Sequence, residues 1–268
     1  MLYNYCVLLY FRDWSRVREV TRVYTFNIRL ADITAEVHAI YESTRRFCCD
    51  YLTDQPAEIS VTVTPEDIAE ERSRSDAEHK LEGIPIPDFS DAYLETLALY
   101  RHLTRELLRY DVLLVHGSAI MMDGAVYLFT ARSGTGKSTH TRLWREVFGE
   151  RCTMVNDDKP LLRITDGGVT VYGTPWNGKH RLGENISAPL SAICILTRSE
   201  ENFITPVTVS EALPHIFTQV NRPTDPDALR RTMLLTDRLM HTVSLYRLGC
   251  NMSEDAALVA YGGMSKNK

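Results

Sequence analysis

The sequence lacks the signatures of several classes of protein. Its six cysteines are scattered without Cys-x-x-Cys spacing, which argues against zinc and disulfide frameworks and leaves reduced thiols as the expectation. There is no long basic block and the formal net charge is −5, so nothing indicates a nucleic-acid-binding surface. No internal repeat or low-complexity tract is present. The expected partner is therefore a small molecule, a peptide or a protein.

No segment of the sequence indicates a membrane protein. The apolar opening, residues 1–11, has no basic leader and no small-residue cleavage site, and it is too short to cross a bilayer. We expect a first strand or an unstructured extension there rather than a signal peptide. The sequence thus predicts a cytoplasmic protein without a membrane partner, and it leaves open whether the chain forms a homo-oligomer.

Length and composition predict a globular protein with a sizeable core. Of its 268 residues, 44% are hydrophobic and 24% are charged, which are ordinary values for folded domains. Two prolines in residues 84–88 indicate a break. We place a boundary near residue 90, with a small α+β region over 1–90 as a candidate acceptor-binding region and a catalytic domain over 91–268.

Hydrophobic periodicity predicts the elements on both sides of this boundary. Alternation predicts strands over 24–38, in two short runs, and over 58–63, and helical spacing predicts a helix over 40–52. The charged stretch 66–82 is interpreted as a solvated helix or a linker. Leucines at three- and four-residue spacing predict a long helix over 91–110.

The larger region is predicted to be rich in hairpins. Asp-Gly at 123–124 and Asp-Gly-Gly at 166–168 indicate tight turns between apolar runs. The predicted strands are 112–120, 125–130, 153–160, 161–164, 169–172, 192–196 and 243–248, and the predicted helices are 138–148, 209–220, 226–243 and 253–261, the last with Ser253 as N-cap. The fold class is therefore α/β with a mixed, hairpin-rich sheet rather than a Ras-like parallel sheet.

Residues 131–138 contain the residue types that phosphate binding requires. The stretch reads Ala-Arg-Ser-Gly-Thr-Gly-Lys-Ser, between an apolar run and a helix-compatible segment. Its two glycines let the backbone approach a polyphosphate, with N–H groups and a helix N-terminus facing the anion. A plain glycine turn before a surface helix is the alternative, but the full pattern favours nucleotide binding. The predicted binding residues are Ser133, Gly134, Thr135, Gly136, Lys137, Ser138 and Thr139, with Lys137 on phosphate and Ser138 on Mg²⁺.

Two adjacent carboxylates, Asp157 and Asp158, end the next predicted strand, 20 and 21 positions after Lys137. Neighbouring side chains on a strand point to opposite sides, so one can face Mg²⁺ while the other faces an attacking hydroxyl. Such a pair suits phosphoryl transfer, in which a carboxylate accepts the proton of the nucleophile. A polar turn after a strand is the alternative. Beside a phosphate loop we favour the catalytic interpretation.

Two further residues are candidates, each with a structural alternative. His116 ends a predicted strand, and residue logic supports a catalytic role only weakly because most isolated histidines are structural. Lys179 lies on a turn-rich loop that could close over the phosphates. A surface loop anchored by a buried Trp176 is the alternative for that segment.

Together these motifs resemble the catalytic domain of HPr kinase/phosphorylase, whose nucleotide-binding fold is shared with phosphoenolpyruvate carboxykinase. The resemblance covers about residues 110–260, and residues 1–90 resemble nothing that we can name. It rests on His116-Gly117, a short hairpin, Ser133-Gly134-x-Gly136-Lys137-Ser138 and a strand ending in Asp157-Asp158. Residues 173–179, Gly-Thr-Pro-Trp-Asn-Gly-Lys, are similar to an element of compact, divergent HPr-kinase-like proteins, some of which phosphorylate serine on peptides.

The resemblance implies a kinase that uses ATP and Mg²⁺. It implies Lys137 on phosphate, Ser138 and one aspartate on the metal, the other aspartate as base, and His116 supporting the carboxylate. The sequence leaves open which aspartate is the base and which binds the metal; we assign Asp158 to the metal. Two features depart from the family: Ala131 replaces the first loop glycine, and the C-terminal signature that contacts HPr is not recognisable. HPr itself is therefore not the expected acceptor.

The predicted function is transfer of phosphate from ATP to a hydroxyl, with serine of a peptide or small protein as the acceptor. A small-molecule hydroxyl kinase would use the same site chemistry. A non-catalytic ATP-binding switch or assembly factor is a different class, and the aspartate pair argues against it because a switch needs no base for an alcohol. Carboxykinase activity is least expected, since no cluster for binding oxaloacetate is visible.

Overall fold

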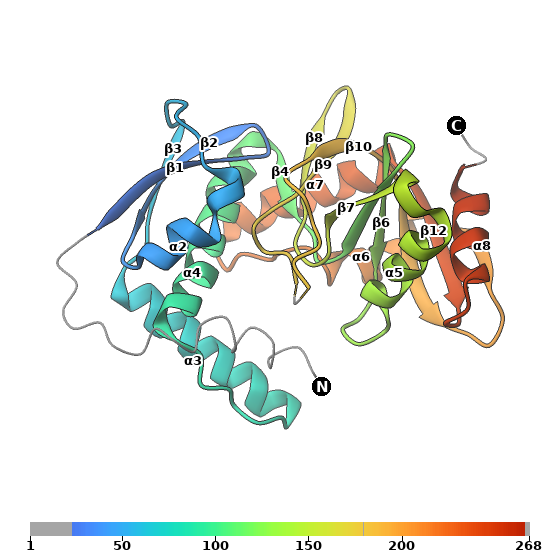
Figure 1. Cartoon of the computed structure of the whole chain (residues 1–268), viewed down its shortest axis with the longest axis horizontal. Coiled ribbons are helices and arrows are strands. Elements are labelled where there is room, and N and C mark those ends of the chain that lie inside the picture. Colours follow the sequence, from blue (N-terminus) through green and yellow to red (C-terminus); the bar gives the residue numbers. More distant parts are fainter. Residues whose placement is uncertain (1–22, 179, 266–268) are drawn as a thin grey trace. The chain divides into compact units, whose positions relative to one another are not determined.

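The computed structural model describes residues 23–178 and 180–265, and the chain divides into two compact units, Met1–Glu106 and Leu107–Lys268 (Figure 1). The division falls at the end of helix α4 (Asp91–Leu107), so all but the last residue of this helix group with the first unit, whereas we placed the boundary near residue 90. The apolar opening, residues 1–11, lies outside the described residues. Within the described ranges, no helix combines the length and the apolar character that crossing a membrane requires.

The described part of the first unit contains a small sheet whose first two strands form a hairpin. β1 and β2 pair antiparallel, and Ala31 and Asp32 make the turn with φ of 50° and 64°, as tight two-residue hairpins require. β3 pairs parallel with β2. The elements are β1 (Tyr24–Leu30), β2 (Ile33–Ala39), α2 (Glu42–Phe47), η1 (Cys49–Tyr51), β3 (Ile59–Thr62), α3 (Pro65–Glu82) and α4.

The charged stretch of the first unit is a helix, α3, and not a linker. Thr64 and Asp67 form a reciprocal capping box at its start, with Pro65 in the first turn, and Gly83 ends it in the left-handed conformation. Signals at both ends therefore define this helix even though its sequence has almost no apolar stripe.

The second unit is larger and follows the predicted order of elements closely. It adds β11, which the sequence did not predict, and a strand β10 that begins before residue 192. The elements are η2 (Leu108–Tyr110), β4 (Val112–Leu114), β5 (Ser118–Met122), β6 (Ala125–Thr130), α5 (Lys137–Phe148), η3 (Gly149–Arg151), β7 (Cys152–Asn156), β8 (Leu161–Thr165), β9 (Gly168–Tyr172), β10 (Ser187–Arg198), β11 (Phe203–Pro206), α6 (Val209–Phe217), α7 (Pro226–Thr242), β12 (Ser244–Cys250) and α8 (Asp255–Met264).

These strands form one mixed sheet. The order is β4-β8-β9-β10-β6-β5-β7, with β12 beside β10 and β11 beside β12. β10 runs parallel to β6 and to β12, whereas β5–β6, β5–β7, β8–β9 and β4–β8 pair antiparallel. The prediction of an α/β fold with a mixed, hairpin-rich sheet is confirmed.

Helices cover both faces of this sheet (Figure 1). Successive residues of β6 point to opposite faces: Val126 and Leu128 pack in the core with α6 and α7, and Tyr127 and Phe129 pack in the core with α5 and α8. All four are fully buried, and burying a side chain of this size stabilises the fold by about 1.5–3 kcal/mol. β6 is thereby fixed at the centre of the unit, and the loop that follows it leaves from a rigid strand.

The structure corrects two of the predicted elements. The predicted strand 112–120 is two strands, β4 and β5, separated at residues 115–117. A Cβ at Gly117 would lie 2.8 Å from Leu128 Cδ1 and 2.9 Å from the Phe129 oxygen, so only glycine fits where the chain passes β6. Ser253 is not the N-cap of α8: Glu254 holds that position, and the Ser253 hydroxyl donates to Asn251 instead.

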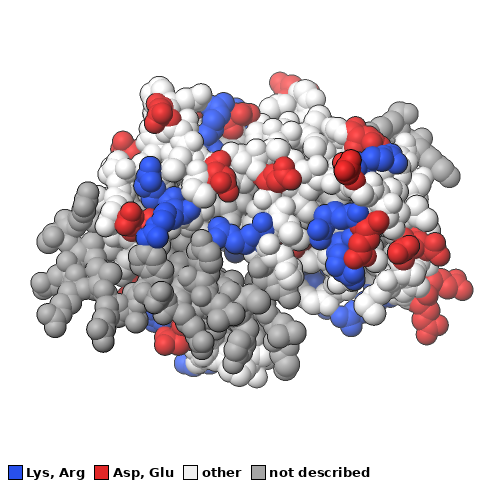
Figure 2. Space-filling view, in the orientation of Figure 1, with Lys and Arg blue, Asp and Glu red and all other residues white. Residues whose placement is uncertain are grey.

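Charges of both signs are mixed on the described surface. Figure 2 shows Lys and Arg side chains interspersed with Asp and Glu on the face that it presents. The described part of that face carries no extended patch of one sign. The absence of a nucleic-acid partner stays a prediction.

Candidate active site

The loop between β6 and α5 is shaped by its glycines. Gly134 has φ of 74°, and Gly136, the N-cap of α5, has φ of 123°, a region that other residues rarely adopt. The loop is closed by a hydrogen bond from the Thr135 N–H to the Arg132 oxygen at 3.2 Å. Ser133 and Gly134 are exposed, and Thr135 and Gly136 are half-buried. The strand, glycine loop and helix therefore follow one another as phosphate binding requires.

Two cations hold the backbone of this loop. Lys137 is buried, and its Nζ donates to the Ala131 oxygen at 3.1 Å. Burial lowers the pKa of Lys137, while the negative charges of Asp158 and Asp157 oppose that fall. Arg198, at the end of β10, donates to the Gly134 oxygen at 2.6 Å. Because β10 runs parallel to β6, the parallel register carries Arg198 to the same edge of the sheet as the loop.

Asp157 faces the loop. It follows the end of β7 and is buried, and Ser118 on β5 donates to its Oδ1 at 2.7 Å. Against the effect of burial, the Ser138 hydroxyl, in the first turn of α5, lowers the pKa of this carboxyl. Burial raises the pKa of Asp157 and the charge of Asp158 adds to the rise, whereas both serine hydroxyls lower it. Asp157 therefore hydrogen-bonds Ser118 directly, and the loop serine Ser138 acts on its charge.

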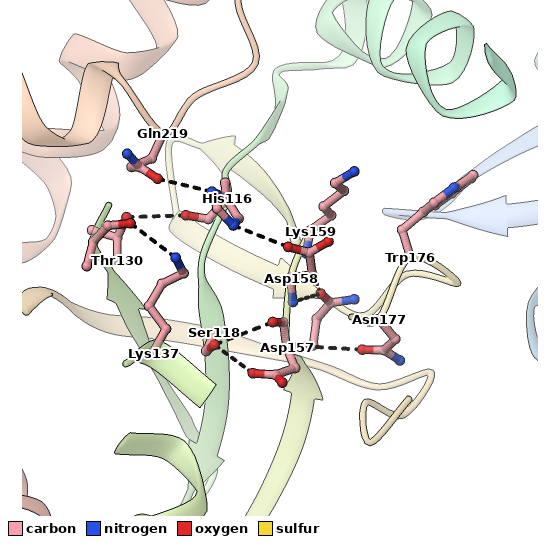
Figure 3. Close-up of polar contacts among 12 residues, drawn as sticks. His116, Ser118, Thr130, Lys137, Asp157, Asp158, Lys159, Trp176, Asn177 and Gln219 are labelled. Carbon is pink, nitrogen blue, oxygen red and sulfur yellow. Dashed lines mark hydrogen bonds and ion pairs between the residues drawn. The ribbon is translucent and has the colours of Figure 1, made fainter. Parts of the chain in front are cut away.

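Asp158 faces the opposite way, toward His116. Its Oδ1 lies 3.2 Å from His116 Nε2, and the other ring nitrogen of His116 lies 3.1 Å from Gln219 Oε1 (Figure 3). The backbone N–H of Gly117 donates to the backbone carbonyl oxygen of Asp158 at 3.0 Å. A backbone hydrogen bond therefore also holds the segment of His116 beside that of Asp158. The adjacent aspartates thus have different partners, although they lie in the turn after β7 and not on the strand that we predicted over 153–160.

A buried amide shapes the turn that carries both aspartates. Asn156 is fully buried, and its Oδ1 accepts from the N–H groups of Asp158 at 2.9 Å and Lys159 at 2.6 Å. Its Nδ2 donates to Thr174 Oγ1 at 2.9 Å, which ties the turn to the loop after β9. Because the side-chain oxygen of Asn156 accepts from two backbone N–H groups of the turn, it stabilises the turn.

The loop 173–178 packs against the aspartates. Asn177 Oδ1 accepts from the Asp157 N–H at 3.2 Å, and a Cβ at Gly178 would lie 3.8 Å from Asp157 Oδ2. Trp176 is buried, as the interpretation of an anchored loop expects. Lys179 lies outside the described residues, so its assignment to phosphate stays a prediction.

The structure brings together His116, Lys137, Ser138, Asp157 and Asp158, which the sequence had singled out along the chain. Ser138 opposes the rise that burial causes in the pKa of Asp157, which favours Asp157 as the carboxylate beside the loop. Thr139 is half-buried in the first turn of α5.

Sequence reasoning missed several polar residues of the site. Asn156 directly precedes the aspartates at the end of a strand, where asparagine often makes a turn, so its role could have been noticed. Nothing in the sequence pointed to the others, because their partners are distant along the chain. The missed residues are Ser118, Asn156, Asn177, Arg198 and Gln219.

The donor atoms at Ser138 and Asp157 suit Mg²⁺. A hydroxyl and a carboxylate are hard oxygen ligands, and Mg²⁺ in nucleotide sites takes one or two protein oxygens with phosphates and water completing the shell. Over residues 23–178 and 180–265, no three His, Cys, Asp or Glu side chains gather into a group that could hold a metal by themselves. The residues present therefore fit a metal that arrives with a nucleotide and not one held by protein alone.

No protein-family model and no curated protein matches the sequence. Among solved structures, the chain is similar to the Hpr(Ser) kinase/phosphatase from Coxiella burnetii, with 9% sequence identity and a TM-score of 0.33. The match covers 57% of this chain and 97% of that one. A likeness of this degree indicates a distant structural relationship only.

Proposed function

We propose that the protein is a Mg²⁺-dependent kinase that transfers the γ-phosphoryl group of ATP to a hydroxyl, with serine of a peptide or small protein as the acceptor. One observation carries the proposal: two adjacent carboxylates beside a glycine loop have different partners, Asp157 the Ser118 hydroxyl and Asp158 a histidine. The loop serine Ser138 also opposes the rise that burial causes in the pKa of Asp157, which supports Asp157 as the carboxylate on the phosphate side. Phosphoryl transfer needs both a metal ligand at the phosphates and a base for the incoming alcohol. A nucleotide switch needs only the metal ligand and no base for an alcohol.

The phosphate side of the site is formed by the loop and Lys137. Gly134 and Gly136 allow the backbone N–H groups to approach phosphate, and Lys137 exchanges its contact with the Ala131 oxygen for the β- and γ-phosphates. Breaking one hydrogen bond to a neutral carbonyl costs little beside a charge-assisted bond to phosphate. A bound Mg²⁺ would neutralise charge on the phosphates, held by Ser138 and Asp157. We therefore move the metal assignment from Asp158 to Asp157.

The acceptor side is formed by Asp158. As the acceptor oxygen bonds to the γ-phosphorus, the bond from that phosphorus to the β,γ-bridging oxygen breaks and ADP leaves. The hydroxyl proton passes to the carboxylate of Asp158, whose Oδ1 lies 3.2 Å from His116 Nε2. Asp158 is buried, so its orientation is fixed before the acceptor arrives.

The test is incubation of the full chain with γ-labelled ATP, Mg²⁺ and candidate serine peptides or a metabolite pool, followed by mass spectrometry of whatever gains a phosphate. We expect label on a serine hydroxyl in the wild type and none with Asp158→Asn. Asp166→Asn, a fully exposed carboxylate at the β8–β9 turn, is the matched control and should keep full activity.

Three results would oppose the proposal in different ways. Label on a metabolite would move the acceptor to the small-molecule class and keep the kinase. Label found only as free phosphate would favour a nucleotide-hydrolysing switch. Full activity in both Asp157→Asn and Asp158→Asn would remove the catalytic assignment. The acceptor-binding role of the first unit stays a prediction.

A further inference from the structure

Gln219 is joined to His116 by side chain and backbone, although 103 positions separate them. The His116 N–H donates to the Gln219 oxygen at 2.7 Å, and the Asn221 N–H donates to the Leu114 oxygen at 3.0 Å. This short ladder extends β4 beyond its last residue and fixes the two side chains against each other. The contact between Gln219 Oε1 and His116 Nδ1 is therefore held by the fold and does not depend on one side-chain rotamer.

The hydrogen bonds beyond Gln219 set the direction of this contact. Thr218, the C-cap of α6, donates its hydroxyl hydrogen to the His215 oxygen at 2.7 Å, and a carbonyl can only accept. The Thr218 oxygen must then accept from Gln219, whose Nε2 lies 3.0 Å away. With its nitrogen committed to Thr218, Gln219 presents its oxygen to the ring (Figure 3). An amide oxygen can only accept, so Nδ1 of His116 must carry a hydrogen.

From this chain of donors we propose that Gln219 is a positioning residue that keeps the proton of His116 on Nδ1 and so aims Nε2 at Asp158. The tautomer of a histidine is set by the hydrogen bond that its other nitrogen makes. With its hydrogen on Nδ1, the neutral ring offers Nε2 as an acceptor 3.2 Å from Asp158 Oδ1, so Nε2 can accept a hydrogen bond from Asp158 once that carboxyl has taken the proton of the acceptor hydroxyl. Without Gln219, the hydrogen can move to Nε2, which would then donate to the unprotonated carboxylate. The catalytic consequence rests on the proposed function, because it assumes that Asp158 is the base, whereas the tautomer itself does not depend on it.

The test determines which ring nitrogen of His116 carries a hydrogen. In the ¹⁵N-labelled full chain, two-bond ¹H–¹⁵N spectra distinguish protonated from bare ring nitrogens, and loss of one signal set in His116→Asn assigns His116. We expect Nδ1 to carry its hydrogen in the wild type even at about pH 9, far above the ordinary titration range of histidine. In Gln219→Leu we expect Nδ1 to be bare at that pH, and in Gln219→Glu, which restores an acceptor, protonated again. A bare Nδ1 in the wild type, or a protonated one in Gln219→Leu, would overturn the assignment.

A second, milder variant tests the same contact in case Gln219→Leu does not fold. Thr218→Val keeps the size of the side chain but removes the oxygen that holds the Gln219 amide, so the amide can flip and we expect a mixture of the two tautomers. A single Nδ1–H form identical to the wild type would contradict the chain of donors.

The kinetic arm separates this inference from the kinase assignment. With the acceptor found in the labelling experiment, Gln219→Leu should lower kcat about 10- to 100-fold, within the range that proton transfer contributes, and leave KM for ATP unchanged. An unchanged kcat, or a loss that appears only in KM, would overturn the positioning role. If the wild type transfers no phosphate to any acceptor but the spectra are as expected, the kinase proposal fails and the tautomer assignment stands.

Discussion

His140 lies in α5, and its buried ring predicts that the second unit loses stability in acid. Its ring is buried, lies 4.5 Å from the Phe129 ring by centroid, and accepts a hydrogen bond from Trp144 Nε1 at 3.0 Å. Burial lowers the pKa of His140 from 6.5 to about 4. Protonating Nε2 would also remove the acceptor that Trp144 uses. The folded protein therefore keeps this ring neutral at pH values where the unfolded chain binds a proton.

The sign and size follow from linkage. Because the pKa of His140 is lower in the folded state, the unfolded state binds more protons between about pH 6.5 and 4, and the free energy of unfolding rises with pH across that window. The contribution of His140 to the free energy of unfolding is fully present above the pKa of the unfolded state. It is lost as the pH falls to the pKa of the folded state. At about 1.4 kcal/mol per unit, lowering the pH from neutrality should cost ~2 kcal/mol by pH 5 and ~3 kcal/mol by pH 4.

The measurement is urea unfolding at several pH values, compared between the wild type and His140→Gln. Trp144 and Trp176 both belong to the second unit, so tryptophan fluorescence in a Trp14→Phe background reports the unfolding of that unit. The glutamine retains an oxygen that can accept from Trp144 but does not titrate. The contributions of all other titrating groups therefore cancel when the stability of the variant is subtracted from that of the wild type at each pH.

We expect the stability of the wild type to fall more steeply with acid than that of His140→Gln, by the amounts above. His241→Gln changes an exposed histidine of α7 and should behave as the wild type. Equal pH dependence in the wild type and His140→Gln would refute the reasoning.

Further outcomes can be checked at the site. Lys137→Ala should weaken ATP binding about 10- to 100-fold by calorimetry, since a hydrogen bond to a charged group contributes about 1.5–3 kcal/mol, with Lys80→Ala, on the surface of α3, unchanged. Asp157→Asn should raise the Mg²⁺ concentration needed for half-maximal transfer, and an unaltered Mg²⁺ dependence would place the metal elsewhere. Asp158→Asn should lower kcat about 10²- to 10⁴-fold with ATP affinity retained, and equal losses in both quantities would argue against a base. Gly117→Ala should lower the free energy of unfolding by about 1–3 kcal/mol, because a Cβ there would lie 2.8 Å from a leucine methyl, and an unchanged urea midpoint would contradict that clash.

Much of the fold could be predicted because its signals are local. The hairpin turn at Asp123-Gly124 and the apolar run 125–130 depend on residues a few positions apart, and the structure has the turn and a strand there. The failures lie where a distant contact decides. The strand predicted over 112–120 breaks because its middle residues pair with a segment near Gln219, and no pattern within the strand records that partner.

What the sequence by itself determined is the set of chemical groups: a glycine loop with Lys137 and Ser138, and two adjacent carboxylates on a strand end. These motifs can be recognised because they are local: phosphate binding needs consecutive backbone N–H groups, and the two carboxylates are neighbours in the chain. Only the tertiary structure decided that Asp157 meets Ser118, that Asp158 meets His116, and that Gln219 lies behind the ring. These pairings depend on the order and register of strands far apart in the chain, and that order is set by packing of the whole sheet.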